Sequence, residues 1–220
     1  MRKRTTLQLA LGQLTRWHVT KVKTMVRSGC LISSFIRVMT VLAFSGSPRP
    51  GSAIGHLLRA AAAVAPAGVQ FSFFESLLSL PLFSPDQDRL GAVPPATVTA
   101  LRSQLQAADA VLIATPEYAY GMPGSLKNPL DWLVSSGSFY GKPTAVLSAS
   151  PSEAGAEKAH AGLLLTLTAL GAAVVRTASF PVPFVRAKLD VAGVVTDAAF
   201  AAQLGAAMNA LVATVATPVS

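Results

Sequence analysis

The sequence predicts an α/β protein built on a doubly wound parallel sheet, and two observations support that fold class. Beyond Met39, short apolar runs alternate with longer Ala- and Leu-rich runs, which is the pattern of repeated strand–helix units. The chain of 220 residues is also 51% hydrophobic, which suits a single domain with a large core. We therefore expect one sheet with helices on both faces within residues 39–220.

The expected strands are short apolar runs bounded by Gly, Pro or polar residues. They cover residues 40–44, 69–74, 110–114, 144–149 and 172–178. In the second strand the apolar residues Val69, Phe71 and Phe73 alternate with other residues. The third strand is apolar throughout until a Thr-Pro dipeptide, where proline, which has no N–H, ends the hydrogen bonding of the strand. The fourth follows Pro143, and the fifth follows Gly171, a fitting helix C-cap.

The expected helices carry apolar residues on one face. They cover residues 52–64, 97–107, 124–134, 155–170 and 196–212. The segments 77–95 and 180–185 hold several prolines and are expected to be irregular connections. Five strands with interleaved helices fit a flavodoxin-like sheet of order 2-1-3-4-5.

Residues 1–38 form a basic extension that differs in composition from the rest. They hold eight of the 18 Lys and Arg residues and no acidic residue, whereas the ten remaining basic residues balance all ten Asp and Glu. The extension fits a targeting segment, or a start assigned too early with Met39 as the true first residue. A basic arm for nucleic acid or anionic lipid is a third interpretation. The formally neutral domain itself gives no reason to expect a nucleic-acid partner.

The single cysteine, Cys30, excludes an intrachain disulfide and a thiolate metal site, which fits a reducing, cytoplasmic location. No run of about 18 uninterrupted apolar residues is present, so no membrane partner is expected. His56 and His160 fall on expected helices without partners at metal spacing. No metal is expected, and both are expected to be surface or hydrogen-bonded histidines.

The loop after the first strand reads SGSPRPGS, residues 45–52. A phosphate is bound by backbone N–H groups, hydroxyls and a helix N-terminus, and a Gly/Ser loop between strand and helix supplies all three. Ser52 is placed as the N-cap, and Arg49 supplies a charge-assisted donor. The segment is neither a P-loop nor a Gly-x-Gly-x-x-Gly fingerprint, and a tight turn with an ordinary N-cap is the alternative interpretation.

The third strand runs into TPEYAYGMPGSLKNPLDW, residues 115–132. Pro116, Glu117, Tyr118 and Tyr120 lie early in it and can contact a planar ligand. In a 2-1-3-4-5 sheet the first and third strands are neighbours at the switch point, so a phosphate cradle and a ring pocket would lie side by side. This combination predicts FMN.

Three segments together resemble the NADPH-dependent FMN reductase family, which includes quinone, chromate and azo-dye reductases. They are SGSPRPGS (45–52), ATPEYAYGMPGSLKNPLDW (114–132) and GKPTAVLSASPS (141–152). The resemblance covers residues 39–212 and implies bound FMN, NADPH or NADH as co-substrate, and a homodimer or homotetramer. Because the flavin carries the hydride chemistry, no catalytic residue is expected, and co-substrate and acceptor are expected to alternate at one face.

The resemblance also implies which residues bind the cofactor. The phosphate loop contributes Ser47, Pro48, Arg49 and Ser52, the ring loop contributes Pro116, Glu117, Tyr118, Ala119 and Tyr120, and the loop after the fourth strand contributes Ser150. The family commonly has Asn at the position of Ala119 and often at that of Ile54. The departure at Ala119 removes a polar ring contact, whereas backbone contacts can survive.

Other conspicuous side chains have structural interpretations. Glu117 is expected to shape its loop or an oligomer contact rather than act as a base. Lys127 and Asp131 are expected to form an exposed ion pair, and Trp132 to lie in the core or at a subunit interface.

The sequence therefore predicts an FMN-dependent NAD(P)H oxidoreductase that passes a hydride to a small acceptor, which is a quinone, azo compound, chromate or free flavin. One alternative is a flavodoxin-type electron carrier, for which an acidic docking surface is expected. The other is a flavin-less binding module that kept the fold.

Overall fold

The structure, a computed structural model, describes residues 38–75 and 77–216 of the chain. The predicted extension, residues 1–38, lies outside the described residues except for Val38. A compact unit begins at Met39 and contains every helix and strand of the described part.

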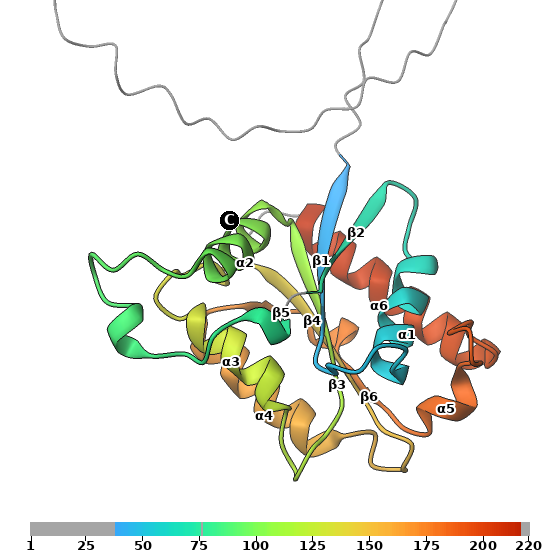
Figure 1. The fold of residues 1–220 in the computed structure, drawn as a ribbon. Coiled ribbons are helices and arrows are strands. Elements are labelled where there is room, and N and C mark those ends of the chain that lie inside the picture. Colours follow the sequence, from blue (N-terminus) through green and yellow to red (C-terminus); the bar gives the residue numbers. More distant parts are fainter. Residues whose placement is uncertain (1–37, 76, 217–220) are drawn as a thin grey trace, which may run out of the picture. The chain divides into compact units, whose positions relative to one another are not determined.

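The sheet is parallel, with the order β2-β1-β3-β4-β5, which confirms the flavodoxin-like prediction (Figure 1). Its strands are β1 (Met39–Ser45), β2 (Val69–Phe74), β3 (Ala110–Thr115), β4 (Pro143–Ala149) and β5 (Ala173–Val174), with β6 (Phe180–Val182) also paired to β4. The α-helices are α1 (Ala53–Ala63), α2 (Ala96–Ala107), α3 (Gly124–Trp132), α4 (Glu157–Ala169), α5 (Val185–Lys188) and α6 (Ala198–Ala216).

Alternate residues of the central strands supply two cores on opposite faces of the sheet. In β3, Leu112 and Ala114 join the core formed with α1 and α6, whereas Val111 and Ile113 join the core formed with α2, α3 and α4. Figure 1 shows the two groups of helices on opposite sides of the sheet. Every residue of β3 is buried because helices cover both faces, which is why its sequence is an unbroken apolar run.

The prediction of one continuous fifth strand over residues 172–178 was wrong. β5 ends after Val174, a 3₁₀ turn η3 (Arg176–Ala178) follows, and β6 lies where a proline-rich loop was expected. The Val146 N–H donates to Ser179 Oγ at 3.0 Å, and that hydroxyl donates to the Val175 carbonyl, so a side chain bridges the interruption. Pro181 is tolerated because β6 is an edge strand, where the missing N–H faces away from the sheet.

In the described part of the connection between β2 and α2, the regular structure consists of two short 3₁₀ turns, η1 (Leu77–Ser79) and η2 (Pro85–Gln87). Helix α3 holds it in place: Trp132 Nε1 and Asn128 Nδ2 both donate to the Pro81 carbonyl, at 2.9 and 3.0 Å. Trp132 is fully buried and packs edge-on against Phe83. The expectation of a core position for this tryptophan is confirmed.

Helix α6 contains the one segment of the described residues that is long and apolar enough, by length and composition alone, to cross a membrane. Its residues Phe200, Leu204, Met208 and Leu211 pack into the core with α1. In this fold one face of α6 therefore packs against the sheet and α1.

The carboxyl ends of β1, β3 and β4 lie at one edge of the sheet, the lower edge in Figure 1. Each of these strands is followed there by a loop and a helix, α1, α3 and α4 in turn. In an open α/β sheet this edge, at the reversal of strand order, is where ligands bind.

Candidate functional site

The loop after β1 (residues 46–52) folds into a compact turn that leads into α1, and we call it the anion loop after its predicted role. Ser52 is the N-cap of α1, with its Oγ accepting the Gly55 N–H at 3.1 Å. The Arg49 N–H donates to Ser47 Oγ at 3.4 Å, so the loop closes on itself before the helix begins. The Arg49 guanidinium is exposed and has no ion-pair partner among the described residues. A free cation beside a helix N-terminus suits a phosphate group.

The anion loop passes very close to the end of β3. The Gly46 N–H donates to the Ala114 carbonyl at 2.7 Å, and Ser125 Oγ in the first turn of α3 donates to the Gly46 carbonyl at 3.2 Å. A Cβ added to Gly46 would lie 2.9 Å from Thr115 Oγ1 and 3.1 Å from Thr115 Cα. Only glycine permits this approach, which brings together the loops that follow β1 and β3.

The loop after β3 contains a two-residue hairpin turn, which we call the tyrosine turn (residues 118–121). The backbones of Tyr118 and Gly121 exchange hydrogen bonds of 2.9 and 3.0 Å. Ala119 and Tyr120 between them have φ values of 49° and 61°, the left-handed region that a type I′ turn requires at both positions. The two tyrosine side chains are 53% and 81% exposed, so they present aromatic surface at the ligand edge of the sheet.

We expect Ala119→Asn to raise the free energy of unfolding by up to about 1 kcal/mol. Alanine in the left-handed region is strained by its Cβ, whereas asparagine adopts this conformation more readily. Chemical denaturation of both proteins measures the difference. Ala119→Val, which adds a β-branched side chain at the same φ, should lower the stability; an equal effect of both substitutions would contradict the explanation.

Glu117 connects the tyrosine turn to helix α4. Its Oε2 accepts the backbone N–H groups of Lys158 and Ala159 at 2.9 and 3.0 Å. Ala156 in the N-cap position provides no side-chain cap, so the carboxylate from a distant loop satisfies the first turn of α4 and interacts favourably with the helix dipole. These contacts agree with a loop-shaping role for Glu117.

We expect Glu117→Ala to lower the free energy of unfolding by roughly 1–3 kcal/mol, because two backbone N–H groups in the first turn of α4, one exposed and one part-buried, lose a charged acceptor. Glu117→Gln keeps one carbonyl oxygen and should lose only part of that stability. Thermal or chemical denaturation distinguishes the three proteins. An equal loss in the free energy of unfolding for Glu117→Gln and Glu117→Ala would argue against the capping role.

The loop after β4 carries Ser150. Its N–H donates to the Val182 carbonyl at 3.3 Å, and its carbonyl accepts the Val185 N–H at 3.1 Å. These bonds fix the loop between β6 and α5 at the same edge of the sheet. The structure thus places all of the predicted cofactor-binding residues on the three loops at that edge. The first two loops are joined through Gly46, and Glu117 joins the second to α4.

A pocket of about 290 Å³ opens on the β2 side of the anion loop. Of the predicted residues, only Ser47 and Pro48 line it, and none of those in the loops after β3 and β4 does. Two charged residues that were missed, Arg59 of α1 and Glu75 after β2, line it as well. Each is an isolated charge in the sequence, and such charges are typical of a solvated surface. The position of Glu75 directly after a predicted strand was a feature of the sequence that could have indicated a site residue.

His160 differs from the expectation of a surface or hydrogen-bonded histidine. It is 9% exposed, and its Nδ1 is buried without a hydrogen-bond partner. Burial lowers the pKa of His160 below its ordinary value of 6.5, because the charged imidazolium loses its hydration. By contrast, the expected ion pair between Lys127 and Asp131 is present and exposed.

We expect the free energy of unfolding to fall as the pH drops below about 6.5, because the unfolded chain then binds a proton at His160 that the folded chain excludes. The loss continues until the lowered pKa of the folded state is reached, with a slope of at most about 1.4 kcal/mol per pH unit. Chemical denaturation between pH 5 and 8 should show a flatter profile for His160→Leu. His56→Gln, at a partly exposed histidine, is the matched control and should keep the wild-type slope.

The observations fit a phosphate-bearing planar cofactor: a free arginine and a capped helix N-terminus follow β1, and a turn that exposes two aromatic rings follows the neighbouring strand β3. A flavodoxin-like sheet with these loops at its switch point is an arrangement in which one class of proteins binds flavin mononucleotide. Residues 39–187 match the family model described as NADPH-dependent FMN reductase. The chain belongs to this family and is an FMN-dependent NAD(P)H oxidoreductase.

Similar proteins agree with this assignment. The chain is 34% identical to a quinone reductase of Escherichia coli (strain K12) over 161 residues, which is 72% of this chain and 84% of that protein. It is 42% identical to an NAD(P)H-dependent FMN reductase of Pseudomonas aeruginosa over 132 residues, covering 59% of this chain and 70% of that protein. Among solved structures, FerB, a flavoenzyme NAD(P)H:(acceptor) oxidoreductase from Paracoccus denitrificans, superposes with a TM-score of 0.70 at 30% identity, over 81% and 98% of the two chains.

Proposed function

We propose that the three loops at the carboxyl edge of the sheet hold FMN, with its phosphate in the anion loop and its ring at the tyrosine turn. The observation that supports this proposal is the contact at Gly46, which joins the loop that carries a free arginine to the end of the strand that leads into a strained aromatic turn. Bound FMN would take a hydride from NAD(P)H and pass the electrons to an acceptor.

In this arrangement the chain binds and orients rather than supplying an acid or base. Backbone N–H groups of the anion loop and the Arg49 guanidinium hold the phosphate. Pro116, Tyr118 and Ala119 shape one side of the ring site, and Ser150 lies on the adjacent loop. Glu117 acts indirectly, because it ties the tyrosine turn to α4.

We propose a quinone as the acceptor class. The exposed tyrosine rings offer flat apolar surface for a planar acceptor, and several relatives are named quinone reductases. A homodimer or homotetramer in the cytoplasm, with no nucleic-acid or membrane partner, completes the proposal.

Two measurements test this proposal. Adding FMN to the purified chain should produce a bound-flavin absorption spectrum with stoichiometric binding, and a protein that stays colourless would contradict the site. Steady-state turnover with NADPH and a panel of quinone, azo, chromate and free-flavin acceptors should give the highest kcat/KM for a quinone, with parallel lines in double-reciprocal plots. A flavin-loaded protein that reduces free flavin or an azo dye better than any quinone would refute the acceptor class alone.

A further inference from the structure

The pocket beside β2 is separate from the proposed ring site. Its walls come from β1, the anion loop, α1, β2 and the residue after it, η1 and the first turn of α3. The lining residues are Ala43, Ser45, Ser47, Pro48, Gly55, Leu58, Arg59, Phe73, Phe74, Glu75, Leu77, Leu78 and Ser125. Phe73 and Leu78 are 38% and 68% exposed, so the pocket leaves apolar surface uncovered that a flat ligand could bury. At about 290 Å³, with apolar walls and the side chains of three serines, Arg59 and Glu75 among its lining, it resembles a small-ligand subsite.

Two unpaired charges lie at this pocket. The guanidinium of Arg59 folds back along α1, with its terminal nitrogens 3.8 and 3.9 Å from the position that a Cβ on Gly55 would take. Neither Arg59 nor Glu75 has an ion-pair partner among the residues that the structure describes. A ligand that uses both charges must carry an anionic group and hydrogen-bond donors.

The position of these charges within the β1–α1–β2 unit indicates the chemistry of the ligand. In dinucleotide-binding α/β folds, the region after the second strand carries either an acidic residue that binds the ribose 2′-hydroxyl of NAD or an arginine that accommodates the 2′-phosphate of NADP. Glu75 directly follows β2, and Arg59 faces the same pocket from α1. The anion loop therefore has the proposed flavin site on its β3 side and this pocket on its β2 side.

We propose that the pocket is the subsite for the adenosine 2′-phosphate half of NADPH. Arg59 pairs with the 2′-phosphate, Glu75 accepts a hydrogen bond from a ribose hydroxyl or the adenine amino group, and Phe73 and Leu78 cover the adenine. This inference rests on the proposed function, since the nicotinamide half must reach a flavin on the other side of the anion loop. It makes Arg59 a determinant of the preference for NADPH over NADH.

Calorimetric titration of the FMN-loaded full chain with adenosine 2′,5′-bisphosphate tests the proposal without turnover. We expect binding to the wild type, and a loss of about 10–100-fold in affinity for Arg59→Gln, the range of one charge-assisted phosphate contact. In steady-state kinetics the same variant should raise the KM for NADPH by a similar factor, with kcat and the KM for NADH unchanged. Glu75→Gln should weaken binding of both the bisphosphate and adenosine 5′-monophosphate.

Arg176→Gln is the matched control, because it removes an exposed arginine that does not line the pocket. Equal affinity of wild type and Arg59→Gln for the bisphosphate would overturn the inference, as would no binding by a wild type that loads FMN and oxidises NADPH. Release of FMN by the bisphosphate would place that ligand in the anion loop and overturn it too. If the chain does not load FMN, as read from the absorption spectrum, the proposed function fails instead. Titration of the unloaded chain with the bisphosphate then still measures the affinity of the pocket.

Discussion

Arg49→Gln should raise the dissociation constant of FMN by about 10–100-fold. The guanidinium is exposed at the start of α1 and has no ion-pair partner in the described part of the chain. No carboxylate there would therefore compete with a bound phosphate for the charge of Arg49. One charge-assisted hydrogen bond contributes about 1.5–3 kcal/mol, which corresponds to that factor. Fluorescence titration of the unloaded chain with FMN measures it. Riboflavin, which has no phosphate, should bind wild type and variant equally.

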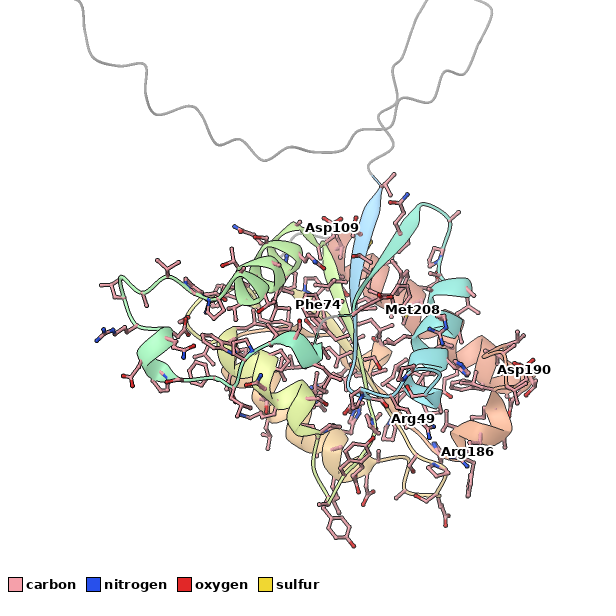
Figure 2. The ribbon with its side chains drawn as sticks, in the orientation of Figure 1. Arg49, Phe74, Asp109, Arg186, Asp190 and Met208 are labelled. Carbon is pink, nitrogen blue, oxygen red and sulfur yellow. The ribbon has the colours of Figure 1, made fainter. Side chains whose placement is uncertain are left out.

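Arg186→Gln provides the control for this prediction. Arg186 belongs to α5, and Figure 2 labels both arginines toward the same end of the domain, so both substitutions remove one positive charge from that region. If direct contact matters, Arg186→Gln leaves FMN affinity within about twofold, because an exposed charge that makes no contact with the ligand acts only through solvent, where salt screens it. An equal loss for the two variants would show that general attraction, not a phosphate contact at Arg49, explains the effect.

Gly46→Ala should lower the free energy of unfolding by roughly 1–3 kcal/mol and weaken FMN binding at the same time. The added methyl would lie 2.9 Å from Thr115 Oγ1 and 3.2 Å from the Ala114 carbonyl, and both residues belong to a fully buried strand. Relief requires the anion loop to move away from β3, which separates the proposed phosphate and ring sites. Chemical denaturation and FMN titration of one variant measure the two effects together.

Gly162→Ala is the matched glycine substitution. It lies in α4, where an added Cβ meets nothing within 4 Å, and alanine should stabilise the helix by about 0.5–1 kcal/mol. FMN affinity should not change. A Gly46→Ala protein with normal stability and normal FMN affinity would show that the close approach of the two loops does not position the cofactor.

Much of the fold was predictable because local patterns and tertiary packing agree. The run 110–114 is uniformly apolar, and β3 is uniformly buried; the break at Thr115-Pro116 marks the end of the strand. The prediction of one continuous fifth strand was wrong because the interruption of that strand depends on the Ser179 hydroxyl, which replaces a backbone hydrogen-bond partner for Val146. A side chain that substitutes for a ladder hydrogen bond leaves no periodic trace in the sequence.

The loops of the candidate site were placed correctly, but their internal geometry was not predictable. Alanine and tyrosine rarely adopt positive φ, so nothing in the residue types predicted the conformation of Ala119 and Tyr120. The partners of Glu117 lie 41 and 42 residues further along the chain, beyond any local pattern. Arg59 and Glu75 were missed for the same reason, since only the fold brings them to one pocket.

The contact between Glu117 and α4 has a kinetic consequence. If the tyrosine turn swings outward to admit or release a bulky molecule, the amides of Lys158 and Ala159 lose their acceptor at that moment. Displacement of the turn and loss of these two hydrogen bonds at the start of α4 would then occur together. Deuterium uptake at those two amides would therefore report displacement of the turn.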